Sequence, residues 1–582
     1  MNGGLTAGTR AGVRRRQAIA YALVAIAVCA FVTWRSAAPT LGWRLEAGVL
    51  SAGCVLALWW LLGYVLRSDV AGGVALVALV AVLGVASRIK EGILGEPLFP
   101  WDLLSLRQAW SIGPHYASPV AIGGAFVAIV VIAAVAWWFR RGARPHGAYV
   151  VAGLALLAVV ASTSVPQSPP FPARNVIWDV RGNIAANGPL LAFVINVQAL
   201  LLKPPAVSTA DANALLDAAH GPAPVSGAHP DVVVILVEAW MDVDNLGSGI
   251  DACLKPRVRH AFQSPRFGGL TPNVEFEVMT GYPDAFVPEF SVPYQMYVKR
   301  PVEHALPQVF RAAGYSTFAA HNYPRSFWNR ANVMPWLGFR RYVGIEDMPP
   351  RPNKGAFPDD AMLFAALEAE LARAQDGPKL VYGLTMGTHG LYDGEARYPR
   401  HEPAPASIGG KLDAAQQLAV GNYLAVAGDV ERELCGFLDR MRERSNETLV
   451  FVFGDHWPTF GRDLTVYREL GIASKPDIYA LPYGESLRMH RTPLIAWSNR
   501  RGDLALTQPV VPAFGLGSEI LRAAGLPVEG VWALELANAG KAASIACCWQ
   551  DAQGRPHDFR DDPVYAALYR DAYDRVLVPR EP

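Results

Sequence analysis

Five apolar stretches near the N-terminus constrain this chain more than any other feature. Each has 18 to 20 residues without Asp, Glu, Lys or Arg, and all lie within the first 165 positions. A helix rises about 1.5 Å per residue, so each stretch can cross a hydrocarbon core of about 30 Å. One such stretch also fits a buried helix or a cleaved signal peptide, but five predict a membrane domain. The predicted spans are Gln17–Trp34, Ala47–Leu66, Val70–Ser87, Val120–Phe139 and Ala148–Val165.

Clustered arginines indicate how these spans are oriented. Arg10, Arg14, Arg15 and Arg16 precede the first span, and three more arginines lie between the fourth span and the fifth. Positive residues concentrate on the cytoplasmic side of a membrane, so we expect the N-terminus inside. Five spans then place everything after residue 165 outside the cytoplasm.

Residues 166–204 are predicted to link the membrane domain to the rest of the chain. Four prolines between Pro166 and Pro172 make a stiff exit from the last span. The run from Gly188 to Leu202 is apolar but has only 15 residues, which is short for a span. We interpret it as a helix at the membrane interface, and a sixth span, which would return the chain to the cytoplasm, is the alternative.

Beyond Pro205 the sequence changes to short apolar runs that alternate with helical patterns. This alternation is typical of an α/β domain with a mostly parallel sheet covered by helices on both faces. The expected domains are therefore 1–165, 166–204 and 205–582. Predicted strands are Val232–Val237, Ser316–Ala320, Leu380–Leu384, Thr448–Phe453 and Pro493–Trp497; predicted helices are Asp360–Ala374, Gln416–Arg444 and a surface helix over Asp561–Val578.

Polar residues follow three of the predicted strands. Glu238 follows the first, the segment Thr385–His389 follows the third, and Asp455 with His456 follows the fourth. Ligands bind at the carboxyl ends of strands in such sheets. Carboxylates with one imidazole suit Mn²⁺, Mg²⁺ or Zn²⁺, although a solvated Glu and a structural Asp-His pair would look the same.

Two further segments carry candidate catalytic groups. Thr271 and Pro272 have the residue types of an N-cap and a first helical position, where backbone N–H groups attract phosphate. A threonine hydroxyl beside a divalent metal is a nucleophile candidate, and a plain structural cap is the alternative. Arg330 offers a planar fork for phosphate oxygens, and Trp328 a wall for a small polyol.

These motifs together resemble the lipoteichoic acid synthase and phosphoglycerol transferase family of the alkaline phosphatase and sulfatase superfamily. The resemblance covers almost the whole chain, including the five spans, the linker and the extracytoplasmic domain. The segments that carry it are VVVILVEAW around Glu238, GGLTPNVEFEVMTGYP around Thr271, FWNR at Phe327–Arg330, GTHG at His389 and FGDHW at Asp455–His456.

The resemblance implies a divalent metal and a covalent mechanism. The metal is most often Mn²⁺ in this family, with Mg²⁺ or Zn²⁺ possible, and Glu238, Thr271, Asp455 and His456 would hold it. Thr271 would attack the phosphorus of phosphatidylglycerol, release diacylglycerol and pass glycerol phosphate to an acceptor hydroxyl.

The resemblance also implies roles for four other residues. Arg330 and His389 would hold the phosphoryl oxygens, and His389 would assist proton transfer. Trp328 would line the glycerol pocket, with His321 as a further substrate-binding candidate.

Departures from the family pattern bear on what the site accepts. Tyr323 stands where Gram-positive synthases carry an acidic residue, which bears on recognition of the glycerol hydroxyls, and Trp457 directly after the Asp455-His456 pair bears on access. The composition is rich in Ala, Arg, Gly and Pro, which suits a GC-rich genome better than a low-GC producer of lipoteichoic acid. We therefore expect a multi-pass protein of the inner membrane with a periplasmic catalytic domain. The expected acceptor is a glycan, with a glycerophosphate polymer also possible.

Three other functions compete with this interpretation. A phosphoethanolamine transferase also has five spans and a threonine nucleophile, but usually brings several disulfides and zinc. A sulfatase needs Cys or Ser as its formylglycine precursor, whereas this chain has Thr271. An inactive membrane-anchored scaffold is the third alternative, although all expected catalytic residue types are present.

Some properties stay open at this level. The net charge of +1 gives no basic field for nucleic acid. Pairing among Cys253, Cys435, Cys547 and Cys548 does not follow from their spacing. The acceptor, the metal, the choice between a single transfer and a polymer, and the oligomeric state also stay open.

Overall fold

A computed structural model describes most of the chain as two compact units, Met1–Leu201 and Leu202–Pro582. The predicted domain boundaries at 165 and 204 stay predictions. The described residues are 7–578 without 39, 95–96, 106–133, 135–144, 163–179, 198–201, 203–204, 225–228, 288–290, 375–376, 391, 393–397, 399–402, 462, 477, 539–542, 546–547 and 552–554.

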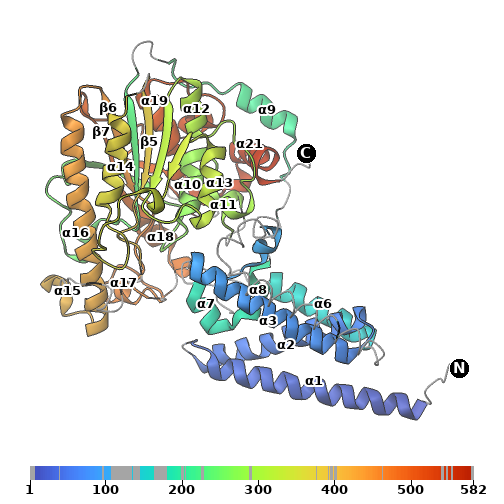
Figure 1. Ribbon diagram of the computed structural model, residues 1–582. Coiled ribbons are helices and arrows are strands. Elements are labelled where there is room, and N and C mark those ends of the chain that lie inside the picture. Colours follow the sequence, from blue (N-terminus) through green and yellow to red (C-terminus); the bar gives the residue numbers. More distant parts are fainter. Residues whose placement is uncertain are drawn as a thin grey trace. The chain divides into compact units, whose positions relative to one another are not determined.

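The first unit is helical (Figure 1). Among its described residues, three segments are long and apolar enough to cross a membrane, namely Arg15–Arg35, Leu41–Val65 and Asp69–Arg88. They agree with the first three predicted spans and suggest a membrane anchor. The described residues of this unit form α1 (Ala7–Arg35), α2 (Leu41–Val65), α3 (Asp69–Leu94), α6 (Gly147–Ser162), α7 (Val180–Asn187) and α8 (Pro189–Ile195), with a 3₁₀ turn η1 (Pro100–Ser105).

The last two predicted spans are not established. The fourth, Val120–Phe139, lies outside the described residues. The fifth begins as α6, an apolar helix of 16 residues, which is shorter than a span of about 20 residues needs. Five spans therefore stay a prediction.

The linker helices α7 and α8 pack within the first unit. Gly188 takes a positive φ of 79° between them, and Pro189 begins the second helix. The Trp43 indole N–H donates to Asn187 Oδ1 at 3.0 Å, and Leu191 and Ile195 are buried beside α2. The described part of the predicted interfacial run thus packs against its own unit, while its place at a membrane interface stays a prediction.

The second unit is built on a nine-stranded, mostly parallel sheet with the order β4-β3-β5-β1-β6-β7-β2-β9, and β8 pairs with β7. All five predicted strands are confirmed as β1, β3, β5, β6 and β7. The strands are β1 (Asp231–Val237), β2 (Val258–Gln263), β3 (Ser316–His321), β4 (Arg341–Val343), β5 (Lys379–Leu384), β6 (Thr448–Gly454), β7 (Arg491–Ser498), β8 (Gly502–Asp503), β9 (Val510–Pro512) and a separate sheet of β10 (Ala543–Ile545), β11 (Cys548–Gln550) and β12 (Pro556–Asp558).

Register in the middle of the sheet brings the functional strand ends together. Central β1 runs parallel to β5 and β6, with Leu236 opposite Leu384 and Val237 opposite Gly454. Every residue of β1 is buried, as expected for a continuous apolar strand covered on both faces. The residues that follow β1, β5 and β6 therefore meet at one edge.

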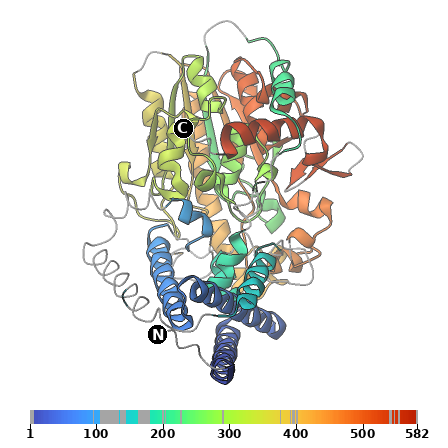
Figure 2. The same cartoon turned by 90° about the vertical axis from the view of Figure 1, so that its right-hand side faces the viewer.

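Helices cover both faces of this sheet (Figures 1 and 2). Helix α14 packs on β3 and β5 and against α16, while α12 contacts β3, and α19 contacts β6, β9 and α10. The helices are α9 (Thr209–Asp217), α10 (Thr271–Thr280), α11 (Pro293–Met296), α12 (Leu306–Ala312), α13 (Arg330–Leu337), α14 (Ala361–Ala372), α15 (Ala406–Gly409), α16 (Ala414–Arg442), α17 (Thr465–Glu469), α18 (Tyr483–Met489), α19 (Ala513–Ala524), α20 (Val531–Ala537) and α21 (Pro563–Ala572).

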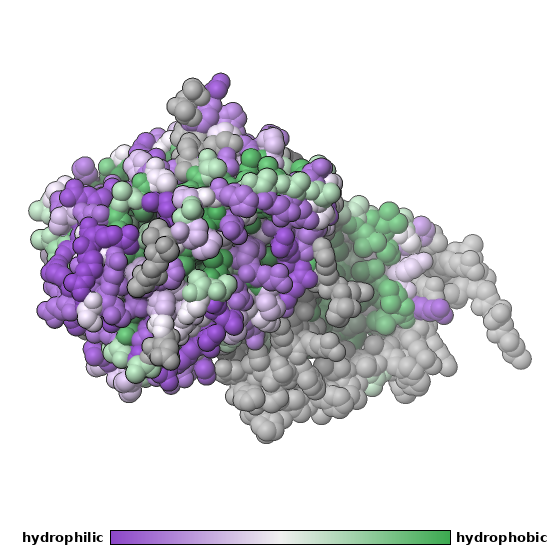
Figure 3. Space-filling model, turned by 90° about the horizontal axis from the view of Figure 1, so that it is seen from above, coloured by the Kyte–Doolittle hydropathy of each residue, from purple (hydrophilic) through white to green (hydrophobic). Residues whose placement is uncertain are grey.

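The C-terminal helix is less exposed than its sequence indicates. Helix α21 buries Tyr565 and Leu568, and Asp571 accepts a hydrogen bond from the Tyr282 hydroxyl at 2.5 Å. The predicted surface helix is present as α21, and one of its faces packs on the second unit. Figure 3 shows hydrophilic residues over most of the visible surface of the second unit, and mainly hydrophobic ones on the visible part of the first.

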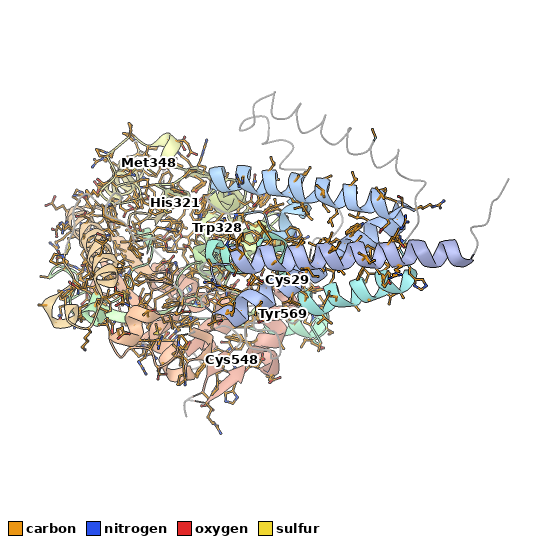
Figure 4. All side chains as sticks on the ribbon, turned by 90° about the horizontal axis from the view of Figure 1, so that it is seen from below. Cys29, His321, Trp328, Met348, Cys548 and Tyr569 are labelled. Carbon is orange, nitrogen blue, oxygen red and sulfur yellow. A yellow bond between two sulfur atoms is a disulfide. The ribbon has the colours of Figure 1, made fainter. Side chains whose placement is uncertain are left out.

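A disulfide joins Cys253 to Cys435 across 182 residues of sequence. Cys548 is also disulfide-bonded, whereas Cys29, on α1 in Figure 4, and Cys54 are free thiols of the first unit. The cross-link ties the segment after β1 to helix α16, so it fastens two distant parts of the second unit.

Replacing both cross-linked cysteines with serine should destabilise the second unit. The Cys253→Ser/Cys435→Ser variant is expected to lose about 2–5 kcal/mol in the free energy of unfolding, because the unfolded chain regains the freedom of a long loop. Urea unfolding followed by tryptophan fluorescence would measure the change. Cys29→Ser is the control, and equal stability of the double variant and this control would contradict the prediction.

Candidate functional site

Four predicted site residues meet at the carboxyl edge of the sheet. Glu238 follows β1, Asp455 and His456 follow β6, and Thr271 begins helix α10. One ligand atom each from Glu238, Asp455 and His456 lie within 4.8 Å of one another. The Thr271 hydroxyl donates to Glu238 Oε2 at 3.0 Å. The structure thus gathers side chains that are up to 218 positions apart in the sequence.

The centre of this cluster has the form of a cation site. His456 Nε2 lies 3.3 Å from both Glu238 Oε1 and Asp455 Oδ2. His456 Nδ1 lies 2.9 Å from the Trp457 carbonyl oxygen, which turns Nε2 toward the carboxylates. Neither His456 Nε2 nor Asp455 Oδ2 makes a hydrogen bond to the described residues, although both are buried. These two buried atoms without a partner, one on a hard carboxylate and one on a borderline imidazole, fit a divalent metal.

Electrostatics explain why the cluster favours a cation. Burial and the charge of Glu238 both raise the pKa of Asp455, to about 7. Burial alone would lower the pKa of His456, but Asp455 and Glu238 raise it to about 9. Burial opposes ionisation of Glu238 as well, yet the nearby His456 ring, at 3.3 Å, together with His389 and the Thr271 hydroxyl, lowers its pKa. Without a metal, the proton on His456 takes the role of the cation.

Thr271 differs from its predicted role as an N-cap. Leu270 is the cap and Thr271 is the first helical residue, so its hydroxyl is free to reach Glu238 instead of capping the backbone. Leu270 has a φ of 63°, which is strained for a branched side chain and follows two glycines that also have positive φ. This turn presents the Thr271 oxygen at the N-terminus of α10, where N–H groups favour phosphate.

Arg330 is more deeply buried than the sequence indicates. Its Nε and Nη2 donate to Glu275 Oε2 at 2.9 and 2.6 Å, and the side chain is only 1% exposed. Tyr382 holds the other oxygen of Glu275 at 3.0 Å. Nη1 of Arg330 has no hydrogen-bond partner among the described residues. Glu275 thus occupies two of the three guanidinium nitrogens, and Nη1 is left to donate to an anion.

Of the other three predicted residues, His321 is buried, and only Trp328 and His389 lie on a more open side of the site. His321 ends β3, and its Nδ1 lies 3.0 Å from the Leu384 carbonyl oxygen. Burial and the charge of Arg330 lower the pKa of His321 to about 3, so the ring is neutral with an acceptor at Nε2. His389 and Trp328 are partly exposed.

The sequence analysis assigned no role to several residues that support the site. Thr385 accepts the backbone N–H of Glu238 at 3.0 Å, and Thr388 donates to its carbonyl oxygen. Asp360 accepts from Asn322 at 2.8 Å and from the N–H groups of Met386 and Gly387, which fixes the loop that carries His389. Two threonines in a strand-end loop were a visible signal, whereas nothing in the sequence points to Asp360.

One face of α16 holds the strained turn after Glu238. Ala239 has a φ of 47°, and its carbonyl oxygen accepts from the Tyr423 hydroxyl at 2.9 Å. Eight residues on, Glu431 accepts from Trp240 Nε1 and from the N–H of Asp251, both at 2.9 Å. Cys435 lies four residues further and forms the disulfide. Tyr423, Glu431 and Cys435, on one face of α16, therefore hold the turn that follows Glu238 and so fix the position of this residue.

Comparison with known proteins assigns the chain to a family. The sulfatase family profile matches residues 230–526. The chain is 30% identical over 467 residues, 75% of its length and 71% of the relative's, to a protein of Rhizobium meliloti named "Putative cyclic beta-1,2-glucan modification protein". It is 25% identical over 241 residues, 39% of the chain and 41% of the relative, to a capsular polysaccharide biosynthesis protein of the same bacterium.

A solved structure shares the fold. The phosphoglycerol transferase GacH of Streptococcus pyogenes aligns with a TM-score of 0.50 and 15% identity, over 64% of this chain and 95% of that one. The resemblance stated from the sequence motifs is thereby confirmed at the level of domain and fold. Because the family profile spans more than half of the chain and includes every residue of the cluster, this protein belongs to the sulfatase family.

Proposed function

We propose that this protein is a membrane-anchored transferase that moves glycerol phosphate from phosphatidylglycerol to a glycan outside the cytoplasm. The observation that carries the proposal is the buried Thr271 hydroxyl, 3.0 Å from Glu238 and at the N-terminus of α10. A nucleophile at a helix N-terminus, beside a cation site, suits attack on a phosphodiester. Membership of the family and the shared fold with a phosphoglycerol transferase support a phosphotransferase.

In the first step, Thr271 Oγ1 bonds to phosphorus and the bond from phosphorus to the diacylglycerol oxygen breaks. The hydroxyl proton leaves along the hydrogen bond to Glu238, and the diacylglycerol oxygen takes a proton from His389. The product on the enzyme is a glycerophosphoryl-threonine. A divalent metal held by Glu238, Asp455 and His456, with Mn²⁺ the first candidate, would favour the ionised threonine oxygen and offset phosphoryl charge.

In the second step, an acceptor hydroxyl attacks the same phosphorus. Its proton passes to His389, whose Nδ1 lies 2.6 Å from the Gly390 carbonyl oxygen and which therefore presents Nε2 for proton transfer. Thr271 leaves and regains its proton. Arg330 Nη1 supports the charged phosphoryl oxygens, and neutral His321 accepts a hydrogen bond from a hydroxyl of the glycerol group.

The acceptor and the compartment are part of the proposal. Both relatives from Rhizobium meliloti carry names that refer to glycans, which favours a glycan acceptor over a glycerophosphate polymer. Disulfides form and persist in oxidising compartments, so the Cys253–Cys435 bond supports a periplasmic second unit. Three apolar helices support the anchor in the inner membrane.

Removal of the nucleophile is the direct test of this function. Purified full-length protein with Mn²⁺ and fluorescent phosphatidylglycerol should release diacylglycerol, and Thr271→Ala should lower the rate by more than about 10³-fold. Thr280→Ala is a matched control, because Thr280 lies on the same helix and bonds to Phe276 instead. Release from fluorescent phosphatidylethanolamine instead would replace the proposal with a phosphoethanolamine transferase, and release from neither lipid would exclude a lipid donor.

Metal affinity should depend on pH with a definite sign. Binding needs neutral His456 and ionised Asp455, whose pKa values are raised to about 9 and about 7. Protons therefore compete with the metal in acid, and affinity for Mn²⁺ should rise between pH 6 and 8.5, by up to about tenfold per pH unit for each proton displaced. Calorimetry on the metal-free protein in two buffers of different ionisation enthalpy would count the protons. Affinity that stays constant over this range would contradict the assignment of these ligands.

A further inference from the structure

A buried carboxylate at the start of helix α14 has only neutral hydrogen-bond donors around it. Asp360 is 5% exposed and precedes Ala361, the first residue of the helix. Its Oδ1 accepts from Asn322 Nδ2 at 2.8 Å, from the Met386 N–H at 2.8 Å and from the Gly387 N–H at 3.1 Å. Asp360 makes no ion pair with the residues that the structure describes. Because an ionised carboxylate loses hydration on burial, these three donors must replace the lost water.

The three donors come from two loops at the carboxyl edge of the sheet. Asn322 directly follows β3, and Met386 and Gly387 lie in the loop after β5. The second loop continues to His389, whose N–H donates to the Met386 carbonyl oxygen at 3.1 Å. Asp360 therefore fastens the segment that carries His389 to the segment that follows β3.

Gly387 lets the carboxylate approach this loop closely. Its N–H lies 3.1 Å from each oxygen of Asp360. A Cβ built on Gly387 would clash with Asp360 Oδ2, so a larger residue there must displace the carboxylate or the loop. The preceding Asp359 has other partners among the described residues: it accepts from the Ala361 N–H at 3.1 Å and pairs with Lys354 at 3.1 Å. Of two adjacent aspartates, Asp360 is thus the one that holds this loop.

We propose that Asp360 is a positioning residue for the proton transfer by His389. This proposal rests on the proposed function, in which His389 protonates the diacylglycerol oxygen as its bond to phosphorus breaks. A proton donor acts only within hydrogen-bond reach of the leaving oxygen, so a small displacement of its loop lowers the rate steeply. Met386 and Gly387, whose N–H groups Asp360 accepts, come three and two residues before His389. Asp360 acts through these N–H groups and not on the substrate.

A substrate whose leaving group needs no proton tests this role. Diacylglycerol must be protonated as it leaves, whereas p-nitrophenolate leaves as a stable anion. In a single turnover of full-length protein with Mn²⁺, Asp360→Ala should release diacylglycerol from phosphatidylglycerol about 10- to 100-fold more slowly. Its release of p-nitrophenolate from glycerol p-nitrophenyl phosphate should fall by less than about threefold. Gly387→Ala should show the same pattern, and Asp359→Ala, the matched control, should release both products as the parent protein does.

Hydrogen exchange examines the loop without catalysis. In Asp360→Ala the amides of Met386 and Gly387 lose their acceptor, and they should exchange about tenfold faster, as measured by mass spectrometry on the peptide that contains both. The same peptide should keep the parent rate in Asp359→Ala. Asp360→Asn keeps one oxygen acceptor, so its exchange rate and its diacylglycerol release should lie between those of the alanine variant and the parent.

Failure of this proposal is distinct from failure of the proposed function. Equal losses on both substrates in Asp360→Ala would indicate general support of the site and overturn the proposal, as would unchanged exchange at Met386 and Gly387. His389→Ala is the reference, and equal losses on both substrates there would overturn the role of His389 and the proposal with it. Absence of diacylglycerol release from the parent protein would overturn the proposed function, and the exchange rates would still decide whether Asp360 holds the loop.

Discussion

Burial of two carboxylates and an imidazole at one end of the sheet is the constraint on which the site depends. Ionised groups lose several kcal/mol of hydration when they are buried, and this loss must be offset by fixed partners. Here Asp455 accepts the N–H groups of Ala239 and His456 at 2.7 and 2.8 Å, and two threonines hold the backbone of Glu238. A divalent cation would complete the balance of charge. These hydrogen bonds therefore keep the three side chains together. Without them, the backbone could move, and water or a neighbouring carboxylate could separate the side chains.

The strands and the residues that follow them could be predicted because both signals are local. A continuous apolar run such as β1 predicts a strand that is buried on both faces. Parallel pairing then brings the carboxyl ends of the strands to one edge of the sheet. The same reasoning failed for β2 and β4, since β2 contains Arg259 and His260 and β4 has only three residues. The role of Thr271 as an N-cap was also misjudged, because the cap depends on the positive φ of Leu270. The grouping of Glu238, Asp455 and His456 was foreseeable from sequence, but the distances between them were not.

Hydrogen bonds between residues that are distant in sequence could not be predicted. Nothing local indicates that Glu275 occupies two donors of Arg330 or that Glu431 on α16 holds Trp240, since these pairs are 55 and 191 positions apart. The residues with strained backbone angles could not be predicted from the sequence for the same reason. Among the described residues, six non-glycine residues have positive φ; three of them, Ala239, Leu270 and Asn329, are the immediate neighbours of Glu238, Thr271 and Arg330, and a fourth, Trp328, precedes Asn329. Left-handed conformations at Ala, Leu and Trp are unfavourable in isolation, so tertiary packing must impose them.

The site has a closed half and an open half, and this division bears on specificity. Glu238, Thr271, Asp455 and His456 are at most 6% exposed, and each is tied to neighbouring backbone or side chains. Changes there would disturb the candidate nucleophile and the cation site. The rings of Tyr323, Trp328, Phe357 and His389 are partly exposed and come from loops after β3 and β5 and before α14, where substitutions alter the surface without moving the cluster. Tyr323, where the sequence departs from the motif that it otherwise resembles, belongs to this open half. A fold arranged in this way can retain one phosphoryl-transfer chemistry while its acceptor changes.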